Sequence, residues 1–597
     1  MLWGEAVSMR FMRALFALCT LVLLAAAPPA SQVTVKLIAI NDFHGYLEPS
    51  ESFALPDPTD PAKSLRVPVG GAAYLATAIA QLRSENPRNV MVGAGDMVGA
   101  SPLGSAMFHD EPTIQALNAI GLEFTSVGNH EFDEGKDELL RKQHGGCRPG
   151  GKIGVDTCLV DGKFAGAKYR YLAANVIDEA TGKTLFPPYA IKYFDAGKGQ
   201  RVGIAFIGVV LRDTPVVTTA FGVRGIRFLD EATTINALLP AIYAQGVHAV
   251  VVLIHQGILT KVGYNDPSCA GADGDLLPVL DKLDRSIRLV VSGHTHRAYL
   301  CANGQGTNNP HVFYTSAGKY GQIVSDITVD LDSATGTIAN IAARNELVVN
   351  DHASNPIART DSALTPDPAI AALVARYESA TAPLVNRVIG HITADISLDG
   401  REVARGGSGE SAMGDIIADA RVAAANVPPP APSIGLVNGG GIRSFLSFTS
   451  AAVPKTPGDV TFGEAYNVEP FNDLLYTETL TGRQLIELLD EQWIGKKEVE
   501  LLGTSQNLTY TWDASKPDGA SKLVPESVKF DGKPIDLAAP YRVTIDAFMA
   551  DGGDGYVVLR QGNQKTTGPI DLSALDAYIT AHSPLAPPPL NRIVRLH

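Results

Sequence analysis

The sequence predicts an α/β protein in which two domains are joined by a helix. The chain has 597 residues, more than a single domain of typical size. Its first half alternates short apolar runs with helical patterns, and a polar stretch over residues 350–366 precedes a second α/β region. Hydrophobic residues make up 45% of the chain, which is ample for two buried cores. This composition excludes a coiled coil, a collagen-like repeat and a largely disordered chain.

Short apolar runs in the first half have the length and the flanking residues of buried strands. They are Val33–Ile40, Val90–Val92, Val202–Val210, Ala249–Ile254 and Leu289–Val291. Helical patterns at Gly71–Leu82 and Thr113–Ile120 lie between them, and Val324–Leu331 alternates in polarity as a strand does. This order favours a layered α/β domain.

The first thirty residues have the composition of a secretory signal peptide. Arg10 and Arg13 precede the apolar run Ala14–Ala27, which is followed by two prolines and an alanine. The run is shorter than the ~20 residues that a helix needs to span a bilayer, and a short membrane anchor is the alternative. We expect residues 1–30 to be a removed signal peptide and the mature protein to be periplasmic or secreted, without a stable membrane span.

Four cysteines remain beyond this leader, and an even number in an exported chain suggests disulfides. Free thiols or a metal site are the alternatives, but no Cys-x-x-Cys spacing supports metal binding. We expect the pair Cys147–Cys158 across a glycine-rich loop and the pair Cys269–Cys301 across the segment between two histidine motifs. Each bridge typically contributes about 2–4 kcal/mol to stability.

A helix is expected to join the two domains. Asp367 followed by Pro368 is a typical helix start, with Asp as the N-cap and Pro at the first helical position. Apolar residues then recur at positions 370, 373, 374 and 377, so one helix face should be packed. We predict a linker with this helix over residues 350–385 and a second domain over residues 386–597. The expected elements of that domain are the helices Met413–Ala425 and Thr481–Trp493, the strands Ile434–Val437, Tyr541–Ile545 and Tyr556–Leu559, and a proline-rich turn at Val427–Pro432.

The balance of charge argues against nucleic-acid polymers as partners. The 63 Asp and Glu residues outnumber the 49 Lys and Arg residues, which gives a formal net charge of −14. Binding to a phosphate backbone requires a basic face. A negative protein still binds small phosphates where metal ions or a local arginine cluster reverse the field.

Five motifs in the first half follow or end apolar runs and carry metal-ligand side chains. They are Asp42-Phe43-His44, Gly95-Asp96, Gly128-Asn129-His130-Glu131-Phe132-Asp133, His255 and Gly293-His294-Thr295-His296. Carboxylate, imidazole and amide oxygen suit Mn²⁺, Zn²⁺, Co²⁺ or Fe²⁺. Loops at the carboxyl ends of strands converge on one crevice of an open α/β sheet. Because five of the 13 histidines fall in these motifs, we predict a site for two metal ions.

The ordered set of motifs resembles the calcineurin-like metallophosphoesterases. The segment INDFHGYLEP at residues 40–49, together with GNHEFD at residues 128–133, is similar to the 5′-nucleotidase branch of that family. This branch includes periplasmic UDP-sugar hydrolases and 2′,3′-cyclic nucleotide phosphodiesterases. The resemblance covers nearly all of the mature chain. It implies an N-terminal four-layered α/β-β-α metallophosphatase domain over residues 31–349 and a C-terminal α/β nucleotide-binding domain.

The resemblance also implies a cofactor of two divalent metal ions, with Zn, Mn and Co as the candidates. The ligands of one ion would be Asp42, His44, Asp96 and His296. The ligands of the other would be Asp96, Asn129, His255 and His294, with Asp96 as the bridge. His130, oriented by Asp133, would stabilise the transition state or protonate the leaving oxygen. The alternative role of Asp133 is that of a carboxylate at a helix N-terminus.

Substrate residues are expected in the second domain. In the family, two aromatic residues sandwich the base, an Asp in a Gly-Gly-Asp-Gly turn holds the ribose, and Asn and Arg bind base and phosphate. By position these are Phe471, Phe548, Asp554, Asn438 and Arg443. Relatives carry an arginine shortly before a motif that is Glu410–Gly414 here, but Gly406–Gly409 is inserted, so Arg405 is the nearest candidate and Arg401 lies behind it.

The leading hypothesis is an exported, metal-dependent 5′-nucleotidase-type hydrolase that releases phosphate from nucleoside 5′-monophosphates, with UDP-sugars as a further substrate class. One alternative is a 2′,3′-cyclic-nucleotide 2′-phosphodiesterase/3′-nucleotidase, whose members tend to have Tyr where this chain has Phe471 and Phe548. Another is a catalytically silent nucleotide-binding surface protein, which the complete ligand set disfavours. The expected partners are small-molecule nucleotides, and the oligomeric state is left open.

Overall fold

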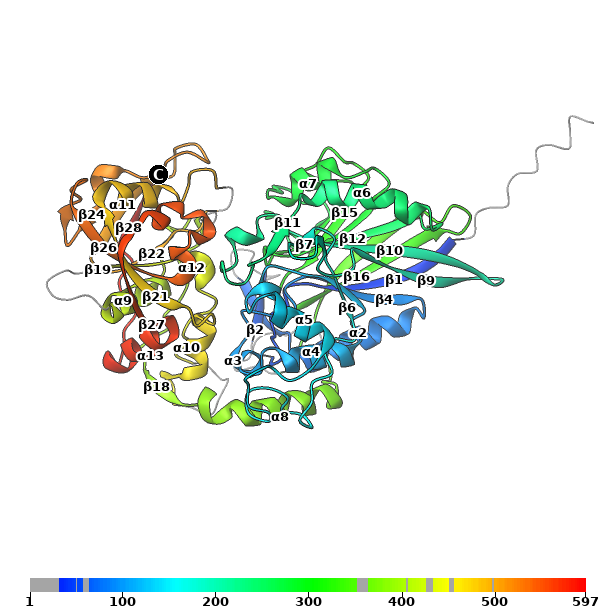
Figure 1. Cartoon of the computed structure of the whole chain (residues 1–597), viewed down its shortest axis with the longest axis horizontal. Coiled ribbons are helices and arrows are strands. Elements are labelled where there is room, and N and C mark those ends of the chain that lie inside the picture. Colours follow the sequence, from blue (N-terminus) through cyan, green and yellow to red (C-terminus); the bar gives the residue numbers. More distant parts are fainter. Residues whose placement is uncertain are drawn as a thin grey trace, which may run out of the picture.

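In the computed structural model of the chain, two α/β domains lie side by side (Figure 1). The structure describes residues 32–49, 51–56, 64–351, 363–403, 406–425, 433–449, 456–496 and 499–597. The predicted signal peptide, Arg405 and the predicted proline-rich turn Val427–Pro432 lie outside the described residues. Among the described helices, none combines the length and the apolar character that crossing a bilayer requires.

The first domain is built on two six-stranded sheets. In the first sheet the strand order is β17 (Ile338–Leu347), β16 (Ile323–Asp332), β1 (Gln32–Ile40), β4 (Asn89–Ala94), β5 (Phe124–Ser126) and β6 (Arg170–Leu172). In the second it is β14 (Ala298–Cys301), β15 (Phe313–Ala317), β13 (Leu289–Ser292), β12 (Ala249–His255), β10 (Gln200–Val210) and β9 (Tyr189–Gly197). Smaller sheets pair β2 (Glu51–Pro56) with β3 (Ser64–Val69), and β11 (Ile226–Phe228) with β7 (Val176–Asp178) and β8 (Lys183–Thr184).

The two large sheets face each other across one apolar core, and helices cover their outer faces. Along β1, Val35 and Leu37 point into the core between the sheets, whereas Ile38 packs under the outer helices, because successive side chains of a strand alternate between faces. The outer helices on the first sheet are α2 (Ala72–Glu85), α4 (Glu111–Ile120) and α5 (Lys136–His144), and those on the second are α6 (Glu231–Tyr243) and α7 (Leu276–Lys282). The predicted four-layered α/β-β-α architecture is therefore confirmed.

Both predicted disulfides are present in this domain. Cys147 is bonded to Cys158 in the loop that follows α5, and Cys269 is bonded to Cys301 at the end of β14. Cys158, Cys269 and Cys301 are buried. The pairing expected from the sequence is confirmed.

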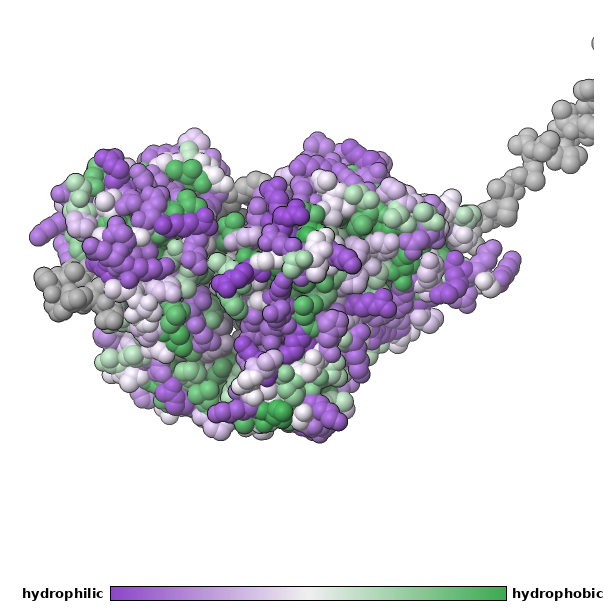
Figure 2. All heavy atoms as spheres, in the orientation of Figure 1, coloured by the Kyte–Doolittle hydropathy of each residue, from purple (hydrophilic) through white to green (hydrophobic). Residues whose placement is uncertain are grey.

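The predicted joining helix is α8 (Pro368–Val385), which runs along the lower edge of the first domain in Figure 1 and leads into the second. Asp367 caps it, since its side chain accepts hydrogen bonds from the backbone N–H groups of Ala369 and Ile370. A second link between the domains is the short helix α3 (Leu103–Ala106) of the first domain, whose Leu103 joins the apolar core of the second domain. A groove runs between the two domains on the face shown in Figure 2.

The second domain contains a five-stranded sheet, a four-stranded sheet and a strand pair. The five-stranded sheet has the order β22 (Gly503–Thr504), β19 (Ser433–Val437), β26 (Pro540–Asp546), β21 (Leu474–Thr481) and β27 (Asn563–Ile570). The four-stranded sheet has the order β25 (Lys533–Pro534), β24 (Lys529–Phe530), β23 (Leu508–Asp513) and β28 (Ile593–Leu596), and β18 (Val388–His391) pairs with β20 (Asp459–Thr461). The helices are α9 (Ala412–Ala424), α10 (Phe462–Val468), α11 (Gly482–Asp490), α12 (Ala547–Ala550) and α13 (Asp571–Ala581).

The predicted strand Tyr556–Leu559 is wrong. This segment belongs to the 3-10 helix η7 (Val557–Gln561), which follows the 3-10 turn η6 (Gly553–Gly555). Asp554 has a φ of 52° and Gly555 a φ of 78°, so the chain turns sharply just before the segment. Val558 and Leu559 are buried in the core of the domain without strand pairing, because a short apolar run fits a buried helical turn as well as a strand.

Glu410 ties the end of the chain to the start of α9. Its carboxylate is 1% exposed and accepts hydrogen bonds from the backbone N–H groups of Asn591, Arg592 and Ile593, at 3.0, 2.9 and 3.0 Å. These residues lead into and begin strand β28. The acidic residue of the predicted Glu-Ser-Ala-Met-Gly motif therefore holds the backbone of the last strand.

We expect Glu410→Ala to destabilise the second domain by about 3 kcal/mol or more, because it leaves two buried N–H groups and one partly buried N–H group without an acceptor. Trp493 and Trp512 are both buried in this domain, so their fluorescence during urea unfolding reports on it. Glu487→Ala, at an exposed position of α11, is the matched control. Equal unfolding midpoints of the Glu410 variant and this control would contradict the assigned role.

Candidate active site

The metal-ligand motifs predicted from the sequence meet at one end of the two large sheets. The central strands of both sheets run parallel: β1 pairs with β4 and β4 with β5 in one, and β12 pairs with β13 in the other. Each motif lies at the carboxyl end of one of these strands, where side chains of an α/β sheet gather. The side chains brought together are Asp42 and His44 after β1, Asp96 after β4, Asn129 after β5, His255 at the end of β12, and His294 and His296 after β13.

The loops that carry these residues turn more sharply than ordinary loops do. Five of the seven candidate ligands have a positive φ, which costs a residue with a side chain roughly 1–2 kcal/mol. They are Asp42 (49°), His44 (48°), Asp96 (52°), His294 (76°) and His296 (56°). Backbone strain of this kind gathers at functional sites. Gly128 is also required, since a Cβ atom there would collide with the Asp96 carboxylate.

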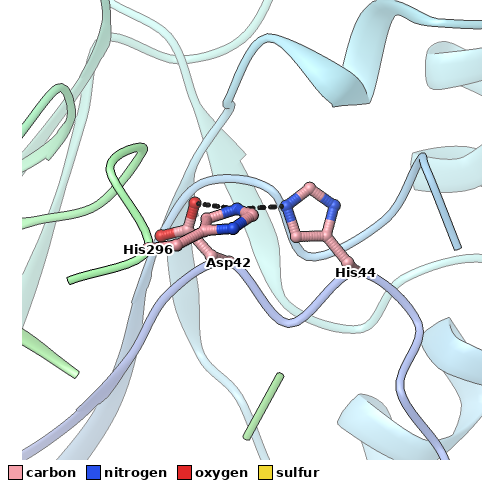
Figure 3. Close-up of side chains that lie close together, drawn as sticks. All are labelled: Asp42, His44 and His296. Carbon is pink, nitrogen blue, oxygen red and sulfur yellow. Dashed lines mark hydrogen bonds and ion pairs between the residues drawn. The ribbon is translucent and has the colours of Figure 1, made fainter. Parts of the chain in front are cut away.

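Asp42, His44 and His296 form the first group of candidate ligands (Figure 3). The two Nε2 atoms of the histidines are 3.1 Å apart, and Nε2 of His296 is 3.4 Å from Oδ1 of Asp42. Nδ1 of His44 lies 2.8 Å from the carbonyl oxygen of Gly99, so this ring presents Nε2 to the site. A hydrogen bond from the second ring nitrogen commonly orients a metal-binding histidine.

The second group is centred on Asp96 and His255. Oδ2 of Asp96 lies 3.0 Å from Nε2 of His255 and 3.5 Å from Nε2 of His44, so one carboxylate oxygen lies between the two groups. Oδ1 of Asn129 is 3.1 Å from the same His255 nitrogen. The Asp42 carboxylate is also within reach of this group, although the family resemblance implied that it would bind one ion only. The ring of His294 contacts that of His255 with the centroids 5.1 Å apart.

Burial sets the charge of the candidate ligands. It lowers the pKa of His294 to about 3 and holds the pKa values of His44 and His296 well below the usual range, so these rings are neutral near pH 7. Neutral imidazole is the form that binds a metal. Burial also raises the pKa of Asp42 to about 7, whereas the pKa of Asp96, which burial alone would raise, is held low by the nearby His255 and His130.

These residues fit a pair of divalent ions. Asp42 and Asp96 are 0% and 1% exposed, and among the described residues no lysine or arginine forms an ion pair with either. Buried carboxylates require a compensating cation. Two metal ions between these carboxylates and the imidazoles would supply it, and nitrogen and oxygen donors suit Zn²⁺, Mn²⁺ or Co²⁺.

His130 and Asp133 lie beside the ligand cluster, as predicted. Nδ1 of His130 is 2.9 Å from Oδ2 of Asp133, and its ring is 5.1 Å from that of His44. The backbone N–H of His130 donates to Oδ1 of Asp96 at 2.9 Å. Burial lowers the pKa of His130, but the carboxylates of Asp133 and Asp96 outweigh it and raise the pKa overall. The pair can thus hold a proton next to the candidate metal ligands.

Two of the predicted substrate residues face His130 from the second domain. The ring of Phe471 stacks on the imidazole with the centroids 6.0 Å apart, and the guanidinium of Arg443 lies 5.9 Å from the centre of the same phenyl ring. Nε and Nη2 of Arg443 are buried and have no hydrogen-bond partner among the described residues. Buried guanidinium nitrogens without a partner are a ready site for an anion.

The other predicted substrate residues form a second group in the same domain. Nδ2 of Asn438 donates to Oδ2 of Asp554 at 2.6 Å, and the ring of Phe548 lies against Gly553 of the same turn. Arg405 is outside the described residues. Arg401 holds the glycine-rich turn instead of facing the metal ligands, because it donates to the carbonyl oxygens of Gly439 and Ile442 and pairs with Glu500.

Glu131 is a supporting residue that the sequence left without a role. It is 1% exposed, and its carboxylate accepts hydrogen bonds from the backbone N–H groups of Asp96, Met97 and Gly128, at 2.8, 2.8 and 2.5 Å. It thereby fixes two ligand-bearing loops against each other. The position of Glu131 inside the Gly-Asn-His-Glu motif is the sequence feature that could have indicated this supporting role.

Asn41 supports the first loop in the same way. Its amide nitrogen donates to Oδ2 of Asp42 at 2.6 Å and to the carbonyl oxygen of Gly318 at 2.7 Å, while its oxygen accepts from the N–H of Ala317. Asn41 therefore connects the Asp42 carboxylate to the end of strand β15 and fixes its orientation. Its position directly before Asp42 gives no signal of this contact, since the partner segment lies 275 residues further along the chain.

Family models match both halves of the chain. Residues 35–298 match the calcineurin-like phosphoesterase family, and residues 388–561 match the 5′-nucleotidase C-terminal domain. The first match contains every candidate metal ligand, and the second contains the five described substrate residues.

Named relatives cover most of the chain. Cell wall protein Lmo0130 of Listeria monocytogenes is 31% identical over 92% of this chain and 67% of its own length. Endonuclease YhcR of Bacillus subtilis is 29% identical over 92% of this chain, but the chain spans only 40% of that protein. Among solved structures, the 5′-nucleotidase precursor of Thermus thermophilus has a TM-score of 0.71 at 24% identity, over 95% of this chain and 100% of its own, so the two share a fold.

Proposed function

Because the chain belongs to the calcineurin-like phosphoesterases that carry a 5′-nucleotidase C-terminal domain, we propose that it hydrolyses nucleoside 5′-monophosphates to nucleosides and phosphate. UDP-sugars are the second substrate class that we include. The leader-like residues 1–30, the two disulfides and the relative named as a cell wall protein support export to the periplasm or the medium.

The observation that carries this proposal is the place of Arg443. Its unpaired Nε and Nη2 belong to the second domain, yet its charge adds to burial in lowering the pKa values of His44 and His296 in the first. A phosphate group between the two domains would satisfy this guanidinium on one side and face the candidate metal ligands on the other.

The residues that would hold two divalent ions are Asp42, His44, Asp96, Asn129, His255, His294 and His296. Such ions act as Lewis acids toward phosphoryl oxygens and lower the pKa of water. Asp96 would contribute to both ion sites, since its carboxylate lies near His44 and near His255. His130 would hold a proton at Nε2, because Nδ1 is engaged by Asp133, and would give it to the leaving ribose oxygen. Arg443 would orient the phosphate, and the burial of these groups limits access of bulk water.

The second domain would bind the part of the substrate that does not react. Phe471 and Phe548 offer aromatic faces for a base, and stacking contributes ~1–3 kcal/mol per base with little dependence on base identity. Asn438 and Asp554, which contact each other, would bind base and ribose. Binding energy from the nucleoside would then be used to orient the phosphate.

The second candidate function is hydrolysis of phosphodiesters, including 2′,3′-cyclic nucleotides. The relative named as an endonuclease, YhcR, is the observation that favours it. The phenylalanines at positions 471 and 548 favour the monoester, since relatives that act on cyclic nucleotides tend to have Tyr there.

A substrate panel with controlled metal loading tests the proposal. The protein is stripped with EDTA and reloaded separately with Mn²⁺, Zn²⁺ or Co²⁺. It is then assayed for phosphate release from AMP, UDP-glucose, 3′-AMP and 2′,3′-cAMP, and for strand cleavage of single-stranded DNA on a gel. We expect EDTA to abolish release, a metal to restore it, and AMP to have the highest kcat/KM. Turnover confined to 3′-AMP and 2′,3′-cAMP, or to DNA, would overturn the monoester proposal, and full activity in EDTA would overturn the metal site.

A further inference from the structure

One buried arginine in the second domain contacts both segments that carry the aromatic candidates for base binding. Arg421, in the last turn of α9, is 2% exposed. Its Nη2 lies 3.0 Å from Oε1 of Glu469 and 2.9 Å from Oδ2 of Asp546, and its Nη1 donates to the carbonyl oxygen of Leu436 at 2.7 Å. A single nitrogen therefore joins two carboxylates that come from different elements.

The positions of these carboxylates in the chain connect them to the two phenyl rings. Glu469 is the C-cap of α10 and stands two residues before Phe471, with only Pro470 between them. Asp546 ends β26, caps α12 by accepting from the backbone N–H of Met549, and stands two residues before Phe548. Moving either carboxylate away from Arg421 would move the phenyl ring next to it.

The contact of Arg421 with Glu469 and Asp546 is an attraction between buried opposite charges. Glu469 and Asp546 are 2% and 4% exposed, so without Arg421 two buried anions would repel each other across a few ångströms. Two further acidic residues, Asp473 and Asp571, lie close to them: burial and the nearby Asp546 raise the pKa of Asp473 to about 7, and burial and the nearby Glu469 raise the pKa of Asp571 well above its usual range. Arg421 is the cation that these four acidic residues share among the described residues.

We propose that Arg421 is a positioning residue for the nucleobase, which fixes the distance and angle between the walls formed by Phe471 and Phe548. The inference rests on the proposed function, because it takes these two rings as the base-binding pair. It predicts that a change at Arg421 weakens binding of the nucleoside part of the substrate and leaves phosphoryl transfer intact, since Arg421 does not contact the metal ligands or His130.

The test compares Arg421→Lys with Arg592→Lys. Arg592 is the matched control, because it is also a buried arginine of the second domain, 5% exposed, and pairs with two carboxylates, Asp415 and Asp419. Unlike Arg421, it contacts neither of the segments that carry the phenyl rings. Lysine keeps the charge in both variants and loses the planar fork that joins two partners. The full-length protein is assayed with AMP and with p-nitrophenyl phosphate, which has no nucleoside, and adenosine binding is measured by calorimetry.

We expect Arg421→Lys to raise KM for AMP and Kd for adenosine by about tenfold or more, with kcat and the p-nitrophenyl phosphate parameters within about twofold of wild type. Arg592→Lys should leave both nucleoside constants unchanged. A folded Arg421→Lys protein with unchanged adenosine affinity would overturn the proposal, as would an equal loss with p-nitrophenyl phosphate.

A second variant covers the case in which Arg421→Lys does not fold. Glu469→Gln keeps the size of the side chain and removes one of the two charges that Arg421 joins, and the same selective loss of adenosine affinity is expected. Adenosine binding also separates this inference from the proposed function: a protein that hydrolyses no 5′-monophosphate refutes that function, whereas the inference is decided by adenosine affinity in the variants.

Discussion

Asp96→Asn is expected to lose both metal ions and to lower kcat by at least about a thousandfold, because one carboxylate oxygen lies between the two groups of ligands. The backbone N–H of His130 donates to Oδ1 of Asp96. In the variant this N–H would keep the amide oxygen at that position, so the amide NH₂ would face His44 and His255, where it cannot bind a cation. The variant therefore removes the bridge with little change of shape.

Metal content per chain by mass spectrometry and turnover of AMP measure this effect. Asp133→Asn is the matched control, since it changes a neighbouring carboxylate that contacts His130 and no candidate ligand. Two ions per chain in both variants would show that Asp96 is not the bridge.

His130→Ala is expected to lower kcat for AMP by about a hundredfold to ten-thousandfold while both ions stay bound, since His130 contacts the ligand loops through its backbone. If His130 gives a proton to the leaving oxygen, the loss should be smaller with p-nitrophenyl phosphate, whose leaving group needs no proton. The ratio of the two losses is the measurement.

Equal losses with both substrates would assign His130 to charge stabilisation and not to proton transfer. A variant that loses its metal ions would make His130 a ligand-loop support. Asp133→Asn should show a smaller loss in the same direction, because it leaves the imidazole in place and removes only the group that orients it.

The sequence predicted the strands that position the candidate site, because those strands are buried on both faces and read as continuous apolar runs. β1 and β12 match their predicted ranges to within one residue, and the ligand motifs directly follow or end them. What the sequence could not give is which ligands share a group: Asp42 reaches both groups only because the two sheets pack face to face.

Elements whose conformation depends on distant contacts were predicted less well. Tyr556–Leu559 is as apolar as a strand, but the left-handed turn at Asp554 and Gly555 directs it into a 3-10 helix. Arg401 was considered as a phosphate ligand, and its true partners, the carbonyl oxygens of Gly439 and Ile442, lie about forty residues away in sequence. The pairing of Arg421 with Glu469 and Asp546 has no local pattern at all.

The contact of Leu103 with the core of the second domain has a consequence for engineering. Helix α3 belongs to the first domain by chain order, yet its Leu103 packs among apolar core side chains of the second domain. In a chimera that carried the second domain of a relative, α3 would pack against core side chains that do not match it. Exchanging α3 together with that domain would keep this packing contact.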